Sequence, residues 1–66
     1  MKLTINGESR EFREGVNIPE VLKSLGLEGK PVVVELNRDA LSPSEFETPS
    51  LKEGDLLEII SIAAGG

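Results

Sequence analysis

The sequence predicts a small α+β domain in which one helix packs across one face of a sheet of four or five strands. Three observations support this prediction. An alternating segment that ends in Asn6-Gly7 is typical of a β-hairpin, and a short segment after residue 16 has the capping residues and apolar spacing of a helix. Two later segments, residues 32–37 and 56–62, are rich in branched apolar residues, as strands are. We therefore expect residues 1–62 to form one folded domain.

The predicted hairpin begins with residues 1–6, where apolar and polar side chains alternate as in a half-buried strand. Asn6-Gly7 then predicts a type I′ turn, because both central residues of this turn need a positive φ. The returning strand, roughly residues 8–13, is polar except for Phe12. We expect Phe12 to anchor this strand to the core.

The predicted helix has signals at both ends. Asn17 is a typical N-cap, Glu20 completes a capping box with it, and Pro19 lies in the first turn, where its missing N–H costs nothing. Gly26 is placed to end the helix in the left-handed conformation. The apolar residues form one stripe at helical spacing and are expected to be core: Ile18, Val21, Leu22 and Leu25.

The segment 32–37 predicts a central strand, because three consecutive valines favour extended backbone. Residues 38–55 are harder to interpret, since Pro43 and Pro49 exclude a long regular element. For this segment we expect a short strand near Leu41 and a 3₁₀ turn. Two of its apolar side chains should be buried, Phe46 and Leu51.

The last predicted strand, residues 56–62, carries more apolar residues than one buried face requires. If Leu57 and Ile59 face the helix, strict alternation places every second residue on the opposite face, beside Val33 and Glu35 of the preceding strand. Apolar residues gathered on a solvent-facing surface predict a docking patch for a partner, formed by Val33, Leu56, Ile60 and Ile62. The competing interpretation is a bulge or twist near the end of the strand that returns Ile60 or Ile62 to the core.

The composition argues against several classes of function. The 66 residues include no His, Cys, Trp or Tyr, so the side chains most used for acid–base catalysis, thiolate chemistry and base stacking are missing. A net charge of −5 opposes binding to the phosphate backbone of nucleic acids. The acidic residues between positions 45 and 55 match no metal-binding spacing and are expected to be a solvated loop. We therefore expect neither an independent enzyme nor a metal site.

The chain also gives no reason to expect a membrane protein. No segment approaches the roughly 20 apolar residues of a membrane span, and the first residues do not follow a signal-peptide pattern. Because the chain has no cysteine, it can form no disulfide bond, and one compact core must supply its stability. We expect a cytosolic protein that is monomeric when free.

The sequence stops four residues after the last predicted strand, at Ala63, Ala64, Gly65 and Gly66. Glycine has no Cβ, so a Gly-Gly end can be threaded through a narrow channel and leaves its carboxylate sterically bare. At about 3.3 Å per extended residue, four residues could reach roughly 13 Å beyond the strand. A frayed terminus is the alternative, since most chains end in poorly ordered residues. We expect residues 63–66 to form a flexible tail.

Taken together, these features resemble the ThiS family of sulfur carrier proteins of thiamin biosynthesis, which have the ubiquitin-like β-grasp fold. The resemblance covers the whole chain and implies a mixed sheet of four or five strands with one main helix across one face. It rests on the order and spacing of four motifs: Asn6-Gly7, residues 32–37 with their terminal Asn, residues 53–55 followed by 57–59, and Ala64-Gly65-Gly66.

The resemblance also implies a function. In the ThiS family an E1-like (ThiF-like) enzyme adenylates the C-terminal carboxylate with ATP, and sulfur that originates from cysteine displaces AMP to leave a thiocarboxylate. A ThiG-like thiazole synthase then accepts this sulfur. By this resemblance Gly66 would carry the sulfur, and Ala63, Ala64 and Gly65 would enter the active site of the partner. The chain itself would bind no cofactor and would act as a protein co-substrate.

The chain departs from the family pattern at residues 41–46. Many members have Val-Pro-Arg after the strand-ending Asn and a Trp two residues later, whereas this chain reads Leu-Ser-Pro-Ser-Glu-Phe. It therefore lacks the arginine and any partner contact made through it. Three alternative functions stay open: a sulfur carrier for molybdopterin or another sulfurated product, a ubiquitin-like modifier joined to lysines through Gly66, and a β-grasp binding module that never reacts.

Overall fold

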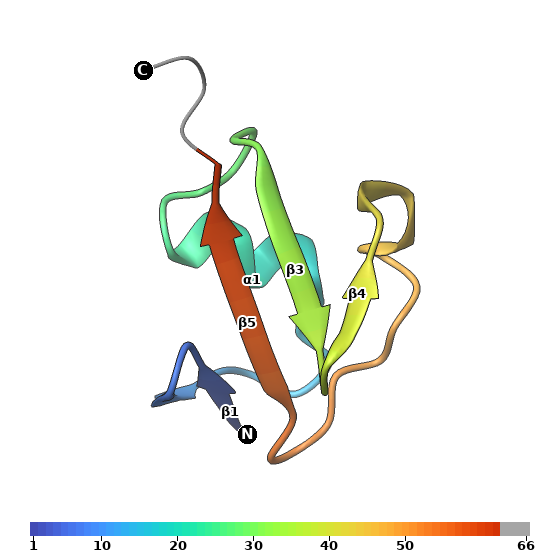
Figure 1. Ribbon diagram of the computed structural model, residues 1–66. Helices are drawn as coiled ribbons and strands as arrows, with labels where there is room; N and C mark the ends of the chain where they lie inside the picture. The colour runs from blue at the N-terminus through green and yellow to red at the C-terminus, as the bar shows by residue number, and fades with distance from the viewer. Residues whose placement is uncertain (63–66) are drawn as a thin grey trace.

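The computed structural model describes residues 1–62, and the predicted tail of residues 63–66 lies outside the described residues. Five strands form one mixed sheet in the order β2-β1-β5-β3-β4, and helix α1 crosses one face of it (Figure 1). The predicted fold class is therefore confirmed. The elements are β1 (Lys2–Ile5), β2 (Glu8–Glu11), α1 (Ile18–Ser24), β3 (Val32–Leu36), β4 (Asp39–Leu41), a 3₁₀ helix (Pro43–Glu45) and β5 (Leu56–Ser61).

Strands β1 and β2 form the predicted antiparallel hairpin. Asn6 has φ 50° and Gly7 has φ 83°, as a type I′ turn requires. Every residue of β2 is exposed, and Phe12, which follows it, is half-buried against the core. The charged side chains of β2 suit an edge strand, because they discourage pairing with other chains.

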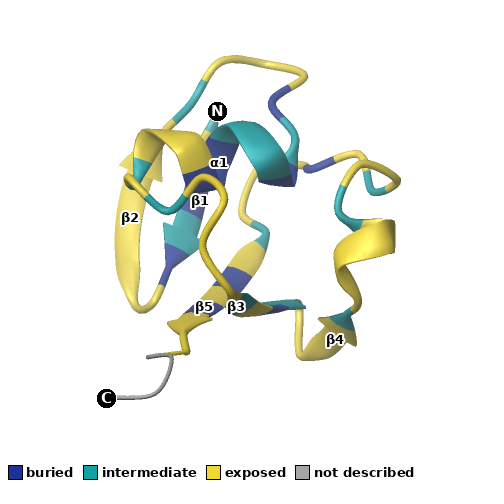
Figure 2. Cartoon of the chain, turned by 90° about the horizontal axis from the view of Figure 1, so that it is seen from above, coloured by how far each residue is buried: buried dark blue, intermediate teal, exposed yellow. Residues whose placement is uncertain are grey.

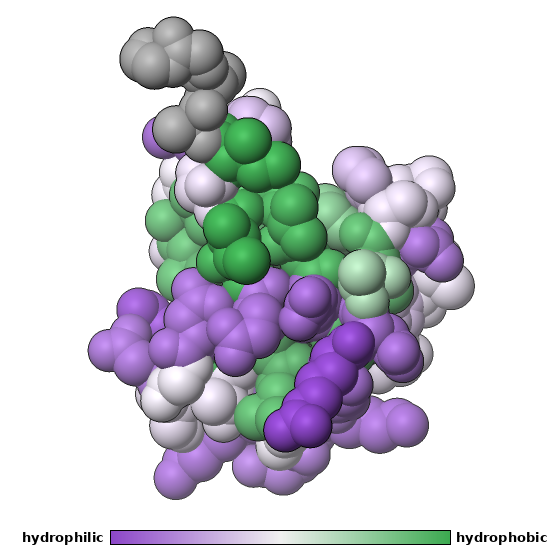
Figure 3. Space-filling view, in the orientation of Figure 1, coloured by the Kyte–Doolittle hydropathy of each residue, from purple (hydrophilic) through white to green (hydrophobic). Residues whose placement is uncertain are grey.

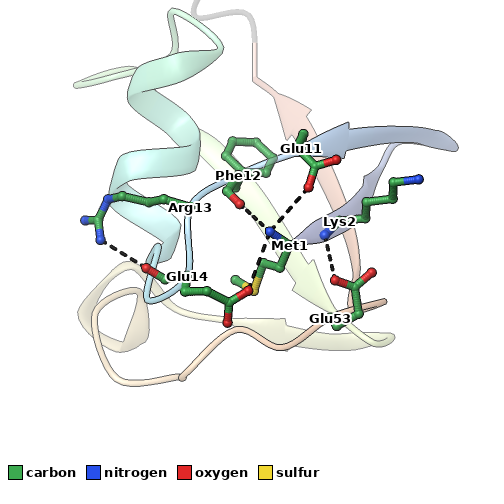
Figure 4. Close-up of polar contacts among 7 residues, drawn as sticks. All are labelled: Met1, Lys2, Glu11, Phe12, Arg13, Glu14 and Glu53. Atoms are coloured by element: carbon green, nitrogen blue, oxygen red, sulfur yellow. Dashed lines mark hydrogen bonds and ion pairs between the residues drawn. The ribbon is translucent and has the colours of Figure 1, made fainter.

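Polar contacts fix the start of β1 on both sides (Figure 4). The amino group of Met1 donates to the carbonyl oxygen of Phe12 at 2.5 Å and lies 3.6 Å from the carboxylate of Glu14. On the other side, the N–H of Lys2 donates to Oε1 of Glu53 at 2.9 Å. Because β1 and β5 run parallel, this cluster lies at the end of the sheet opposite the exit of β5.

Helix α1 has the predicted caps. Oδ1 of Asn17 accepts from the N–H of Glu20 at 2.9 Å, and the Glu20 side chain accepts from the N–H of Asn17, which completes the capping box. At the other end Gly26 has φ 76°, and the N–H of Leu27 donates to the carbonyl oxygen of Leu22 at 2.8 Å. This bond is the 6→1 hydrogen bond of a Schellman motif, so the helix ends where the position of Gly26 in the sequence predicts.

The core lies between α1 and the sheet (Figure 2). Three members of the predicted helical stripe are buried, and Leu25, at the C-cap, is partly buried against the others. Among residues 1–62 no polar or charged residue is buried. The buried residues are Leu3, Ile5, Val16, Ile18, Val21, Leu22, Val34, Leu51, Leu57 and Ile59.

The predicted short strand and 3₁₀ turn of the segment 38–55 are both present, as β4 and Pro43–Glu45. The N–H of Ser42 donates to Oε1 of Glu45 at 2.8 Å, and this bond, with a second from the Ser42 hydroxyl, holds the pKa of the Glu45 carboxyl below its usual value. Leu51 is buried as predicted. Phe46 is only half-buried, because it follows edge strand β4 and packs at the margin of the core.

Candidate functional site

The face of the sheet opposite α1, here called the open face, carries exposed apolar side chains (Figure 3). From Leu56 to Ile60 the burial alternates: Leu57 and Ile59 are 1% and 5% exposed, whereas Leu56 and Ile60 are 44% and 59% exposed. Ile62 is 49% exposed. The alternative that a bulge or twist returns Ile60 or Ile62 to the core is therefore wrong, and the predicted exposure of these residues is confirmed.

Three of the exposed residues gather beside the exit of β5. Val33 lies opposite Ile60 in the β3–β5 register, and the N–H of Ile62 donates to the carbonyl oxygen of Pro31 at 3.0 Å. This bond continues the pairing one residue past β5, so the position of Ile62 is fixed next to Val33 and Ile60. We call these three residues the apolar end of the open face. The predicted threaded residues Ala63, Ala64 and Gly65 and the predicted sulfur-carrying Gly66 follow in sequence and lie outside the described residues.

Two asparagines hold the backbone of β5 from either side. Nδ2 of Asn6 donates to the carbonyl oxygen of Ile59 at 3.0 Å, and the N–H of Ile59 donates to Oδ1 of Asn6 at 2.8 Å. Directly after β3, Oδ1 of Asn37 accepts from the N–H of Leu56 at 2.9 Å, and the N–H of Asn37 donates to the carbonyl oxygen of Leu56 at 2.8 Å. These bonds orient β5 and with it both faces of the sheet.

Sequence reasoning missed the contact between Asn6 and β5. It treated Asn6 only as a turn former, which its φ of 50° confirms. The bond to Ile59 joins residues 53 positions apart, and no local pattern signals a contact of that separation. The one available signal is the side chain itself, since an amide can complete a strand ladder by offering both a donor and an acceptor.

Two carboxylates interrupt the apolar residues in the middle of the open face. Glu58 lies between Leu56 and Ile60 on β5 and is exposed, and Glu35 of β3 lies directly opposite Glu58. Figure 3 shows a purple, polar band across the middle of this face, with a green, apolar surface above it and a smaller green area below it. Sequence reasoning placed Glu35 on the open face but not opposite Glu58. The predicted docking patch is therefore divided, with Leu56 separated from the apolar end.

In the loop before β5, the carboxylate of Asp55 accepts two hydrogen bonds from groups of the fold. Oδ2 of Asp55 accepts from the N–H of Lys52 at 2.8 Å, and its Oδ1 accepts from Nδ2 of Asn37 at 3.1 Å. Within residues 1–62 there is no group of three or more His, Cys, Asp or Glu placed to hold a metal ion, and no pocket. No helix in that range has the length and apolar character needed to cross a membrane. The candidate site in the described part of the chain is a surface.

The chain matches the ThiS family over residues 3–66. It is 39% identical over 62 residues to the sulfur carrier protein ThiS of Thermus thermophilus, a match that covers 94% of this chain and 95% of that protein. It is also similar to the crystal structure of the thiamine biosynthesis protein ThiS from Geobacter metallireducens, with a TM-score of 0.82, 33% identity and full coverage of both chains.

A second kind of relative is much longer. The thiazole synthase of Paramagnetospirillum magneticum is 36% identical over 66 residues, which are all of this chain but 20% of that protein. This chain therefore spans about a fifth of the length of that relative. The thiazole synthase of Magnetococcus marinus is 30% identical over all of this chain, again over 20% of its own length. In both relatives a segment similar to this chain is part of a protein named for thiazole synthesis.

Proposed function

Because this chain belongs to the ThiS family, we propose that it is a sulfur carrier protein that supplies sulfur for the thiazole of thiamin. The observation that carries the proposal is the match over residues 3–66, which includes both the folded sheet and Gly65-Gly66. The full-length likeness to the Geobacter metallireducens thiamine biosynthesis protein supports it.

The proposed cargo site is the carboxyl group of Gly66. A free α-carboxyl group has a pKa of about 3.3–3.7, so it is ionised near neutral pH and is a poor electrophile. An E1-like adenylating enzyme would activate it: the carboxylate attacks the α-phosphorus of ATP, pyrophosphate leaves and an acyl adenylate forms. Sulfur derived from cysteine, at the oxidation level of sulfide, then attacks the acyl carbon and displaces AMP. The product is a thiocarboxylate on Gly66.

In this scheme the chain contributes position and access, and other proteins supply the catalytic groups. The hydrogen bond from Ile62 to Pro31 fixes the point from which the tail begins, next to the apolar end of the open face. Gly65 has no Cβ, and Ala63 and Ala64 are small, which suits entry into a narrow active site. The chain is then a co-substrate of the adenylating enzyme and acts in the cytosol, where ATP and cysteine-derived sulfur are available.

A thiazole synthase is the proposed sulfur acceptor. Two proteins named thiazole synthase contain a segment similar to this whole chain. A carrier segment and its acceptor enzyme in one polypeptide would keep the sulfur at a high local concentration, so their joining supports a functional pair. For this chain the same pairing would occur between the carrier and a thiazole synthase.

The direct test is the intact mass of the protein purified from its own organism. Sulfur carriage predicts a species heavier by the exchange of one oxygen atom for one sulfur atom, lost on hydrolysis of the thioacid and absent from a Gly66 deletion. Finding only the free acid, even after incubation with ATP, a sulfur donor and the cognate adenylating enzyme, would contradict the proposal.

A second measurement separates the proposed acceptor from the alternatives. The thiocarboxylated chain is mixed with the cognate thiazole synthase and its small-molecule substrates, and the loss of sulfur from the carrier is followed together with thiazole formation. If the carrier keeps its sulfur in the presence of thiazole synthase but transfers it in a molybdopterin-forming mixture, the acceptor belongs to molybdopterin formation instead. An adduct between Gly66 and lysine side chains of other proteins would identify a modifier.

A further inference from the structure

We propose that the open face binds its protein partner through a basic side chain of the partner that lies over the Glu35–Glu58 pair, with apolar contacts on both sides of that pair. The inference extends the proposed function, because it names the chemistry of the surface that the adenylating enzyme must present. It concerns side chains of the sheet and is independent of the chemistry at Gly66.

The first argument is the unbalanced charge of the pair. Glu35 and Glu58 are directly opposite in the antiparallel β3–β5 ladder, and like charges in this position destabilise a sheet. Among residues 1–62 the ion pairs involve only Met1, Arg10 and Arg13 as cations, so neither carboxylate has a cationic partner in the described part of the chain. The free chain therefore keeps a repulsion that a partner cation would remove.

The second argument is the setting of the pair. Ile60 and Val33 flank it on one side, at 59% and 38% exposed, and Leu56 flanks it on the other, at 44% exposed. Same-face neighbours on a strand are about 6.6 Å apart, so Leu56, Glu58 and Ile60 together span roughly 13 Å. A partner that covers both apolar groups must also cover the carboxylates between them (Figure 3).

Covering the two carboxylates sets the chemistry of the partner. A carboxylate removed from water without a cation or hydrogen-bond donor carries a large desolvation penalty, so a purely apolar or acidic surface is rejected. An arginine satisfies both groups, because its planar guanidinium presents several donors to neighbouring carboxylate oxygens. The same argument disfavours a second copy of this chain packed through the same face, since that copy would place its own carboxylates over the pair and has a net charge of −5. The occupant is an apolar surface with a central arginine or lysine.

The test is a calorimetric titration of the full chain with the cognate adenylating enzyme at low and high salt. The Glu35→Gln, Glu58→Gln double variant keeps the shape of both side chains and removes their charge. We expect its binding at low salt to weaken roughly tenfold or more, and the salt dependence of its affinity to decrease. Its thermal unfolding midpoint should not fall, because the substitution removes a repulsion.

The matched control is the Glu28→Gln, Glu47→Gln double variant. It makes the same change in net charge at two exposed positions outside the open face, in turns after α1 and after the 3₁₀ helix. We expect it to bind within about twofold of the original chain, since distant exposed charges contribute weakly to affinity. Equal binding by the two double variants would overturn the inference, as would an original chain that does not bind the adenylating enzyme.

Failure of this docking inference can be distinguished from failure of the proposed function. A chain that binds the enzyme through the carboxylate pair but never acquires sulfur would contradict sulfur carriage and leave the docking chemistry standing. A chain that acquires sulfur normally, with binding insensitive to Glu35 and Glu58, would overturn the docking chemistry alone.

Discussion

The two faces of the sheet are built from the same strands and nearly the same apolar residues, yet they differ in what those residues do. On β5, Leu57 and Ile59 are 1% and 5% exposed, while their neighbours Leu56 and Ile60 are 44% and 59% exposed. Residue type does not separate the pairs, since each has one leucine and one isoleucine. The position of α1 decides which apolar residues stabilise the fold and which stay available to a partner.

The largest effect is expected on the covered face. Ile59→Ala removes buried apolar atoms and leaves a cavity, and should lower the free energy of unfolding by about 2–4 kcal/mol. That is a large fraction of the stability of so small a domain. Urea unfolding followed by far-ultraviolet circular dichroism measures it. A loss no larger than that of Ile60→Ala would contradict the assignment of the two faces.

A smaller effect is expected where β5 joins β1. Asn6→Ala removes both side-chain bonds to Ile59 and places alanine at φ 50°, and should cost roughly 2 kcal/mol. Asn6→Gly is the control, because glycine tolerates the positive φ and loses only the side-chain bonds. The difference between the two variants separates backbone strain from the loss of hydrogen bonds. Unchanged stability in both would show that β5 does not depend on this side chain.

The helix that creates the difference between the faces can also be weakened at its cap. Asn17→Ala removes the acceptor for the N–H of Glu20 and should destabilise the fold by about 1 kcal/mol. Asn17→Ser retains a capping oxygen and should stay close to the original stability. The unfolding midpoints of both variants test this ranking, and equal losses would mean that the cap oxygen is not the source of the effect.

The smallest effect on stability, with the clearest effect on function, is expected on the open face. Ile60→Ala should change the free energy of unfolding by less than about 1 kcal/mol, because the side chain mainly contacts its cross-strand neighbour. Binding to the adenylating enzyme should weaken roughly tenfold if Ile60 is central to the docking surface. Urea unfolding and calorimetric titration of the same preparation measure the effect on stability and the effect on binding. Normal binding would move the docking surface elsewhere.

Much of the fold could be predicted because its signals are local. The positive φ at Asn6 and Gly7 and the capping box of Asn17 each involve residues at most three positions apart. The alternation along residues 56–62 likewise depends only on the pleat of one strand, so the exposure of the predicted patch could be predicted too. Phe46 was predicted less well, because its burial depends on how far the core reaches beyond β4.

The sequence by itself determined the Asn6-Gly7 turn, the helix and the alternation of side chains along the last strand, since these follow from backbone geometry over a few residues. Only the tertiary structure decided which strands are neighbours. The parallel pairing of β1 with β5 brings Asn6 to Ile59, and the register of β3 against β5 brings Glu35 to Glu58. Such contacts join distant segments, and a shift of one residue in register would have sent these side chains to other partners.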